Sequence, residues 1–380
     1  MMAKIKVMSV FGTRPEAIKM APLVLELNRR STEFESVTVV TAQHREMLDQ
    51  VLDVFGIHPE YDLNIMKQKQ TLDEITSNVI LHLGSIIEKE LPDIILVHGD
   101  TTTTLAASIC AFYHHVMIGH VEAGLRTWDL NSPFPEEMNR EMTDKIAGLF
   151  FAPTGTSKNN LLKENQNEEN IFITGNTAID ALKVTVTDSY HHDIMRQVSQ
   201  GSRVILVTMH RRENQGEPMR RVFKIMRQVV DEHEDVEVVY PVHLSPAVQK
   251  AAYDILGGDS RIHLIEPLDV VDFHNLAAQS YFIMTDSGGV QEEAPSLGKP
   301  VLVLRETTER PEGVEAGTLK LVGTEPKSVH DAMEDLLNHP SEYEKMSKAQ
   351  NPYGDGEASK RILDAIAYKF SDLRFRPTDF

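Results

Sequence analysis

The sequence predicts an α/β protein with two doubly wound domains, each built on a parallel sheet, that face each other across a cleft. Apolar runs of strand length alternate with longer helical patterns along most of the 380 residues, which is enough chain for two domains. Residues 94–97 are apolar at every position, as a strand covered by helices on both faces requires. In such sheets ligands bind at the carboxyl ends of the strands, so we expect a ligand in the cleft.

The first domain is predicted over residues 1–174, where strands and helices follow one another without a long break. Parallel strands joined by helices form βαβ units, which is why this alternation indicates one sheet. We expect strands at 4–11, 37–41, 93–98, 116–121, 149–152 and 171–174, and helices at 15–30, 45–55, 71–91, 101–113, 135–147 and 154–164.

The second domain is predicted over residues 175–356, because a polar stretch at 188–192 interrupts the alternation before it resumes. A last helical pattern at 357–371 ends the chain. Within the second domain we expect strands at 204–208, 236–240, 262–265, 281–285 and 300–304, and helices at 218–232, 245–256, 270–278 and 290–297.

The amino-acid composition indicates which binding partners and which cellular compartment suit the protein. The formal charge of −19, from 38 basic and 57 acidic side chains, weighs against binding to nucleic acid. A single cysteine, Cys110, fits a reducing compartment. The first residues enter a strand rather than a signal peptide, and no apolar run approaches the ~20 residues of a membrane span. We therefore expect a soluble, cytoplasmic protein with no membrane partner.

The segment 281–313 gives the strongest indication of a ligand site. An apolar strand is followed by Ser287 and the glycine pair Gly288 and Gly289, and then by a helix with Glu292 and Glu293 in its expected first turn. Glycines let the backbone approach a ligand closely, and the free N–H groups of a helix start bind phosphate. Acidic residues just inside such a helix hold sugar hydroxyls in dinucleotide folds. The pattern favours a nucleotide-sugar pocket, although an ordinary strand–turn–helix also fits it.

Cationic side chains gather at the predicted strand ends, as an acidic protein needs in order to bind a diphosphate. Arg14 follows the first strand, and Lys19 lies about one helical turn further on. In the second domain His210 and Arg211 follow the first strand, and His243 follows the next. The alternative for the first pair is a capped helix with two surface cations.

Three carboxylates, Asp100, Glu122 and Glu136, are expected at one edge of the first sheet. Asp100 and Glu122 each follow a predicted strand, and Glu136 begins a helix. Taken singly, Asp100 also fits a helix N-cap, and Glu136 also fits an i,i+4 pair with Arg140 on a helix surface. Together they favour acid–base chemistry.

Several familiar signatures of cofactor and metal sites do not occur in the sequence. No G-x-G-x-x-G follows the first strand, no complete phosphate-binding P-loop is present, and there is no H-E-x-x-H. We therefore expect neither a dinucleotide cofactor nor a catalytic metal.

The ordered motifs of the chain resemble those of bacterial non-hydrolysing UDP-N-acetylglucosamine 2-epimerases over essentially the full length. The resemblance rests on FGTRPEAIKMAPL, HGDTTTT, HVEAGLRT, PEEMNR, HRREN and DSGGVQEEAPSLGKPVLVLRETTERPEG. It implies a glycosyltransferase-B-like pair of Rossmann-like domains, with the helix at 357–371 returning to the first domain. It also implies a homodimer that reversibly converts UDP-GlcNAc to UDP-ManNAc and so supplies ManNAc for cell-surface polysaccharide.

The same resemblance implies site residues by motif position. The catalytic set corresponds to Asp100, Glu122, Glu136, His210, Lys19 and Arg140. The UDP-sugar contacts correspond to Arg14, Lys19, Asp100, Glu122, His210, Phe273, Ser287, Gly288, Gly289, Glu293 and Arg310.

Members from Gram-positive bacteria also bind a second UDP-GlcNAc as an activator. Where such relatives carry Gln and Arg, this chain has Glu46 and Lys69, which weakens the match. The positions that correspond to this allosteric site are Gln43, Gln70, Glu136, Arg211 and His243.

The chemistry of the conversion agrees with these residues. The C2 proton becomes acidic only as UDP leaves C1, so we expect elimination to a 2-acetamidoglucal and re-addition, with acid–base groups serving both faces. Asp100 and Glu122 are expected to handle the C2 proton, with Glu136 assisting. A hydrolysing epimerase that releases free ManNAc and UDP, a glycosyltransferase of the same architecture and a non-catalytic nucleotide-sugar sensor are the alternatives.

Overall fold

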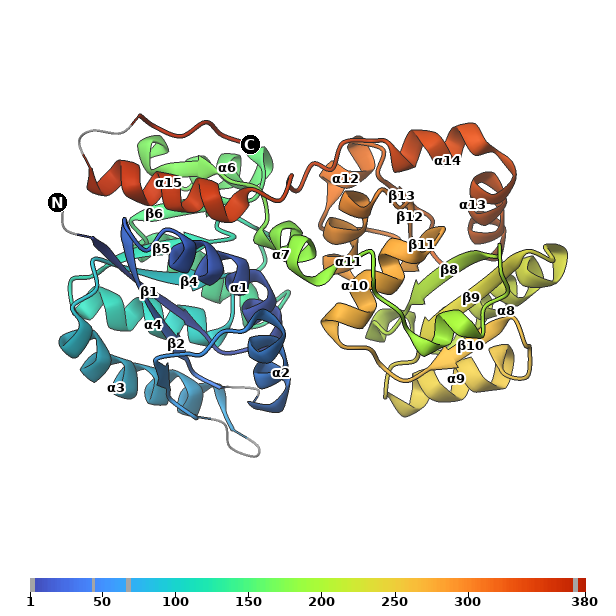
Figure 1. The fold of residues 1–380 in the computed structure, drawn as a ribbon, viewed down its shortest axis with the longest axis horizontal. Coiled ribbons are helices and arrows are strands. Elements are labelled where there is room, and N and C mark those ends of the chain that lie inside the picture. Colours follow the sequence, from blue (N-terminus) through green and yellow to red (C-terminus); the bar gives the residue numbers. More distant parts are fainter. Residues whose placement is uncertain (1–3, 43–44, 66–69, 372–374) are drawn as a thin grey trace. The chain divides into compact units, whose positions relative to one another are not determined.

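The computed structural model describes residues 4–42, 45–65, 70–371 and 375–380. The chain forms two compact units (Figure 1): Met1–Val184 with Tyr353–Phe380, and Thr185–Pro352. The sequence placed the divisions at 174 and 356. Helix α7 (Thr177–Thr185) lies mostly in the first unit, because Asp180 accepts the N–H groups of Ala358 and Ser359 at 3.2 and 2.7 Å.

The first unit contains a seven-stranded, all-parallel sheet in the order β3-β2-β1-β4-β5-β6-β7. Strands β2 and β3 follow β1 on one side of it, and the chain then crosses over to place β4 on the other side of β1. Such a reversal of strand order opens a crevice at the carboxyl ends of the two strands. The strands are β1 (Ile5–Phe11), β2 (Phe34–Val40), β3 (Tyr61–Asp62), β4 (Ile94–His98), β5 (Met117–Val121), β6 (Leu149–Ala152) and β7 (Ile171–Ile173).

Helices cover both faces of this sheet, as the apolar strands require. On one face Val7 and Phe11 of β1 pack with α1, α2 and the carboxyl-terminal helix α15, and on the other Met8 and Val10 pack with α3 and α4. Helix α15, red in Figure 1, thereby completes the first unit from the far end of the chain. The helices are α1 (Arg14–Arg29), α2 (Arg45–Phe55), α3 (Leu72–Glu90), α4 (Thr102–Tyr113), α5 (Glu136–Ile146), α6 (Gly155–Lys163) and α15 (Ala358–Phe370).

The second unit repeats the arrangement with a six-stranded parallel sheet in the order β10-β9-β8-β11-β12-β13. Here the order reverses between β8 and β11. The strands are β8 (Arg203–Thr208), β9 (Val236–Pro241), β10 (Ile262–Ile265), β11 (Phe282–Thr285), β12 (Val301–Val303) and β13 (Leu319–Leu321). The prediction of two doubly wound parallel sheets is confirmed.

The helices of the second unit also form two layers. Helices α8, α9 and α13 share one core with the sheet, and α10 and α11 share the other. In the described ranges, no helix has both the length and the apolar character that crossing a membrane requires. The helices are α8 (Glu217–Glu232), α9 (Pro246–Leu256), α10 (Val270–Gln279), α11 (Gly288–Glu293), α12 (Pro311–Glu315), α13 (Pro326–Asn338) and α14 (Pro340–Ser347).

Two sequence expectations differ from the structure in this unit. Helix α11 begins at Gly288 rather than at Val290, so Glu292 and Glu293 lie beyond its first turn, and a 3₁₀ helix (Ala294–Leu297) follows. Pro295 cannot donate the backbone N–H that would continue the α-helix, which explains the change. The elements α12, β13, α13 and α14 were not predicted.

Candidate active site

The loop after β1 lies at the crevice of the first unit and is fixed by a buried carboxylate. Glu16 accepts the N–H groups of Gly12 and Thr13 at 3.1 and 2.7 Å and the hydroxyl of Thr101 at 2.6 Å. Burial raises the pKa of Glu16. A Cβ on Gly12 would lie 1.9 Å from the Thr41 hydroxyl oxygen, so only glycine fits this loop. The geometry makes Glu16 an anchor of the loop that leads to Arg14, a role the sequence did not reveal.

Glu122, which follows β5, is held by two donors from different segments. Its backbone is left-handed, with φ of 67°, and its side chain is 10% exposed. The carboxylate forms an ion pair with Lys19 and accepts a hydrogen bond from the Asn176 amide at 2.9 Å. Lys19 is therefore directed at Glu122, a partner that the helical spacing of Arg14 and Lys19 did not indicate.

A neutral histidine lies beside this pair. His98 Nε2 is 3.8 Å from Glu122 Oε2 and, within the described chain, makes no hydrogen bond. Burial lowers the pKa of His98 to about 3, with Lys19 acting in the same direction. The ring is therefore uncharged at neutral pH and adds no positive charge to the site.

Asp100, which follows β4, is held by helix α5. Its carboxylate pairs with Arg140, and its backbone carbonyl accepts a hydrogen bond from the Asn139 amide at 2.9 Å. Arg140 also donates to Glu137 at 3.0 Å, and Glu137 is fully buried. The side chain of Arg140 thus points to Asp100 and Glu137 rather than pairing with Glu136 on the helix surface. Half-buried Glu136 begins the same helix.

The loop that contains Asp100 is held by a buried hydrogen-bond network that the sequence did not reveal. His120 Nδ1 is 2.6 Å from Asp144, and its Nε2 is 2.7 Å from the Gly99 carbonyl oxygen. Arg126 donates to Asp144 at 2.7 Å. Burial opposes ionisation of Asp144, but His120 and Arg126 outweigh it and lower its pKa. The network fixes the backbone immediately before Asp100.

Asp100 and Glu122 therefore follow neighbouring strands, since His98 of β4 pairs with Val121 of β5. Each carboxylate has a cationic partner, Arg140 or Lys19. Two carboxylates, a type of group that can transfer protons, therefore lie at the carboxyl edge of the first sheet.

The crevice of the second unit is organised around a different kind of carboxylate. Asp286, fully buried after β11, accepts the N–H groups of His210 at 3.1 Å and of Arg211 at 2.9 Å. It also accepts a hydrogen bond from the Asn214 amide at 2.9 Å. The two loops at the reversal of strand order are thus tied together through backbone N–H groups of His210 and Arg211.

His210, Arg211 and His243 come together around a surface pocket of about 680 Å³. The rings of His210 and His243 stack with centroids 5.3 Å apart. Burial lowers the pKa of His210, and the neighbouring His243 and Arg211 act in the same direction. The pocket is lined by His210, Arg211, Arg212, Glu213, Gln215, His243 and Ser245.

Arg310 lies over the start of α11. Its Nε donates to Glu292 at 2.8 Å, and a Cβ on Gly288 would lie 2.8 Å from its guanidinium carbon. A side chain at position 288 would therefore displace the flexible end of Arg310 from this place. Glu292 holds Arg310 in this position, and the expectation that it binds sugar hydroxyls stays a prediction.

Glu293 and Phe273 are brought together through a histidine on α10. Glu293 Oε2 is 3.4 Å from His274 Nε2, and the ring of Phe273 packs edge-on against His274 with centroids 6.3 Å apart. His274 Nδ1 is also 2.8 Å from the Thr185 hydroxyl. These residues lie on the same face of the sheet as the start of α11.

The expected allosteric positions are only partly described. Gln43 and Lys69 lie outside the described residues, and so does the side chain of Glu46. The Gln70 amide donates to the Ile65 carbonyl at 2.8 Å in the first unit. Arg211 and His243 line the pocket that contains His210.

Comparisons with known proteins show the family to which the chain belongs. A family model described as UDP-N-acetylglucosamine 2-epimerase matches residues 26–367. A Bacillus subtilis protein named UDP-N-acetylglucosamine 2-epimerase is 62% identical over 379 residues, covering 100% of this chain and 99% of the relative. A Neisseria meningitidis protein of the same name is 50% identical over 368 residues, covering 95% of this chain and 99% of the relative.

Solved structures show the same similarity in three dimensions. S. aureus MnaA with UDP superposes with a TM-score of 0.90 at 54% identity, covering 99% of this chain and 100% of that one. UDP-GlcNAc 2-epimerase from Neisseria meningitidis bound to UDP-GlcNAc gives a TM-score of 0.85 at 50% identity, with 96% and 100% covered. An epimerase is an isomerase, and the non-hydrolysing form fits these bacterial relatives. The chain belongs to the UDP-N-acetylglucosamine 2-epimerase family, with a glycosyltransferase-B-like fold.

Proposed function

We propose that the protein interconverts UDP-GlcNAc and UDP-ManNAc by eliminating UDP and adding it back after C2 has been reprotonated. Membership of the family supports UDP-GlcNAc 2-epimerase activity. The observation that carries the mechanism is the pair of cation-linked carboxylates, Asp100 and Glu122, after neighbouring strands at the crevice of the first unit.

Elimination is needed because the C2 proton of GlcNAc is not adjacent to a carbonyl group. As the C1–O bond breaks, its electron pair leaves with UDP, and the electrons of the C2–H bond form the C1=C2 double bond of 2-acetamidoglucal. The proton passes to a carboxylate of the enzyme. Reprotonation on the opposite face and re-addition of UDP at C1 give the epimer, so atoms and charges balance without a redox cofactor.

Two carboxylates serve this chemistry because C2 is deprotonated on one face and protonated on the other. We assign the C2 proton transfers to Asp100 and Glu122, with Glu136 assisting from the start of α5. Lys19 and Arg140 hold the two carboxylates in position.

The leaving diphosphate requires positive charge and hydrogen-bond donors. In the second unit His210 and Arg310 lie after β8 and before α12, and Gly288 and Gly289 bring backbone N–H groups to the start of α11. We propose that these residues, with Ser287, Glu293 and Phe273, bind UDP. Arg14 of the first unit is proposed as a further contact.

Product analysis tests the activity. The purified protein is incubated with UDP-GlcNAc alone, and the products are separated and identified. UDP-ManNAc as the only new sugar nucleotide supports the proposal. Free ManNAc with an equal amount of UDP identifies a hydrolysing epimerase, and an unchanged substrate contradicts catalysis. A glycosyltransferase would show turnover only after an acceptor is added.

We further propose that the protein is a cytoplasmic homodimer whose product supplies ManNAc for cell-surface polysaccharide. Exposed apolar side chains on α3 and α4, Leu81 at 74%, Phe112 at 55% and Tyr113 at 67%, support a subunit contact through the first unit. Replacing Leu81 and Phe112 with Glu should convert a dimer to a monomer in light scattering coupled to gel filtration. Unchanged mass would exclude this surface.

Activation by a second UDP-GlcNAc is proposed at the pocket lined by Arg211 and His243. A sigmoidal rate curve that becomes hyperbolic in Arg211→Ala would support it. A hyperbolic curve for the parent protein would exclude activation.

A further inference from the structure

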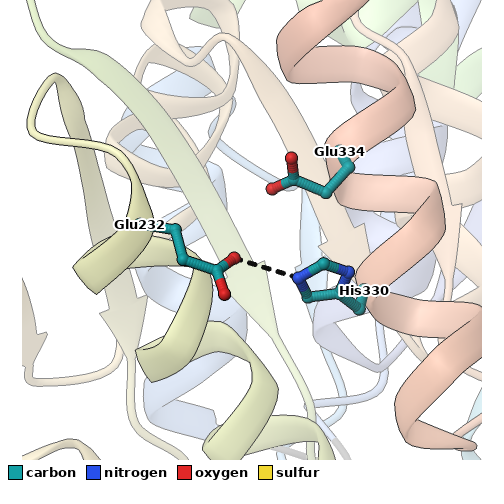
Figure 2. A group of neighbouring side chains, drawn as sticks. All are labelled: Glu232, His330 and Glu334. Carbon is teal, nitrogen blue, oxygen red and sulfur yellow. Dashed lines mark hydrogen bonds and ion pairs between the residues drawn. The ribbon is translucent and has the colours of Figure 1, made fainter.

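A cluster of metal-ligating side chains lies in the second unit on helices that the proposed reaction does not use (Figure 2). Glu232 is the last residue of α8, and His330 and Glu334 lie one turn apart on α13. One ligand atom from each lies within 4.8 Å of the others, and Glu232 Oε2 is 3.0 Å from His330 Nε2. His233, directly after α8, brings its Nε2 to 2.8 Å from Glu334 Oε1.

This cluster is separate from the proposed UDP site. Helix α8 ends immediately before β9 starts at Val236, so Glu232 and His233 lie at the amino-terminal edge of the parallel sheet. His210 and Asp286, in contrast, follow the carboxyl ends of β8 and β11. The group of side chains is thus left without a role in the epimerisation.

We propose that Glu232, His330, Glu334 and His233 bind one divalent transition-metal ion, with zinc as the reference ion. Imidazole nitrogen and carboxylate oxygen together suit zinc and its neighbours, whereas calcium and magnesium prefer oxygen alone. Two carboxylates and two neutral imidazoles carry a charge of −2, which a divalent ion neutralises. The side chains remain accessible, because Glu232 is 42% and His330 27% exposed.

The present separations are close to those of a four-coordinate site. Bonds of about 2.0–2.2 Å place tetrahedral ligand atoms about 3.3–3.6 Å apart. The contacts of 3.0 and 2.8 Å are slightly shorter than that. The ligand atoms of Glu232, His330 and Glu334 all lie within 4.8 Å of one another, so movements of about 1 Å by these surface side chains are enough to bring them to bonding positions. His233 is placed beside these three by its contact with Glu334. Figure 2 shows the three labelled side chains directed toward one another across the gap between the two helices.

Neighbouring side chains orient the carboxylates as outer partners do in metal sites. The Gln228 amide donates to Glu232 at 2.7 Å, and the Asn338 amide donates to Glu334 at 2.6 Å. Buried Met226 of α8 and Met333 of α13 share one core, so a bound ion would stabilise the packing of these helices. The four proposed ligands already contact one another in two histidine–carboxylate hydrogen bonds.

Calorimetric titration of the metal-stripped full chain with zinc chloride tests the site. The titration is run at about pH 8 because Glu232 raises the pKa of His330, and its proton competes with the metal. We expect His330→Ala to lose one bound zinc per chain, or to weaken it by more than the ~10–100-fold that loss of an outer partner costs. His339→Ala, an exposed histidine at the end of the same helix, is the matched control and should bind as the parent does.

A second measurement follows the predicted stabilisation. Zinc at about 100 times its dissociation constant should raise the unfolding temperature of the second unit by roughly 5 °C in the parent and in His339→Ala, but not in His330→Ala. Glu232→Gln keeps the size of the side chain and is the second test variant if His330→Ala fails to fold. Equal zinc binding by the parent, His330→Ala and Glu232→Gln would overturn the proposal, as would a parent that binds no zinc. If zinc bound only at His210 and His243, the parent, His330→Ala and Glu232→Gln would bind it equally, and the proposal would be overturned.

Discussion

The two crevices, one at each reversal of strand order, share a topology and differ in chemistry. In the first unit, the carboxylates Asp100 and Glu122 lie after β4 and β5, and each faces a cation and remains partly accessible. Between β8 and β11 of the second unit, the carboxylate Asp286 is fully buried and binds backbone. The side chains there that we propose to meet the diphosphate are His210 and Arg310.

The difference shows that the same strand order positions both sites, whereas the side chains at each site determine which chemistry is possible there. Both units use one buried carboxylate to hold the loop after their central strand, Glu16 in the first and Asp286 in the second. The first unit adds further carboxylates suited to proton transfer. The second adds cations and glycines suited to a diphosphate.

Glu122→Gln should have the largest effect, because it removes an acid–base group while keeping a hydrogen-bonding side chain. We expect kcat to fall ~10²–10⁴-fold and UDP affinity to change less than about twofold, measured by initial rates and calorimetry. Glu88→Gln, an exposed glutamate on α3, is the control. Full turnover by Glu122→Gln would remove the distinction between the two crevices.

Asp286→Asn should destabilise the second unit, because an amide cannot accept all the N–H groups that the carboxylate accepts. We expect a loss of ~1.5–3 kcal/mol, seen in urea unfolding and in faster hydrogen exchange of residues 209–214. Glu16→Gln is the matched change in the first unit. It should cost less, because burial already disfavours the charged form of Glu16 and raises its pKa. Equal losses of unfolding free energy in Asp286→Asn and Glu16→Gln would show that the raised pKa of Glu16 does not lower the cost of its replacement.

Gly288→Ala should weaken UDP binding without destabilising the protein, because its Cβ would displace the flexible Arg310 side chain. Loss of one charge-assisted hydrogen bond predicts about a tenfold fall in affinity. A Cβ on Gly289 meets Glu293 only at 3.9 Å, so Gly289→Ala should leave Arg310 in place. An equal loss in both variants would assign the effect to close approach of the ligand to the backbone.

Glu309→Gln should have the smallest effect and a defined pH dependence. Burial opposes ionisation of Glu309, but the bonds from Arg305 dominate and lower its pKa from 4.5 to about 2. Its contribution to stability is therefore present above pH 4.5 and lost as the pH falls toward 2.

The size of this contribution is ~1 kcal/mol, since Glu309 is half-exposed and solvent screens the pair. Urea unfolding of the parent and Glu309→Gln at several pH values measures it, with Glu312→Gln as the control. A difference between the parent and Glu309→Gln that does not change with pH would contradict the assignment.

The sequence predicted the parallel sheets because buried strands such as β4 are apolar throughout and are separated by clear helical patterns. It missed β3, which has two residues, and β13, in which Lys320 and Leu321 are exposed, because neither shows a buried-strand pattern. It also placed the start of α11 two residues late, since glycines are poor helix formers and read as a loop.

The placement of several candidate site residues after strands was predicted for a related reason, and their roles stay predictions. Motifs after strands identified Asp100, Glu122 and His210, because the carboxyl ends of parallel strands are where ligands bind. The anchors Glu16, Asp144 and Asp286 were not predicted as such, because their partners are decided by contacts between distant segments. The ion pair between Lys19 and Glu122 spans more than a hundred positions, and no local pattern encodes it.

The most direct test of the proposed chemistry is the incubation of UDP-GlcNAc with the protein in D₂O, followed by proton NMR. Elimination and reprotonation predict deuterium at C2 of UDP-ManNAc and, through the reverse reaction, of the remaining UDP-GlcNAc. Glu122→Gln should slow both exchanges. UDP-ManNAc that retains protium at C2 would contradict proton exchange with solvent through the first crevice.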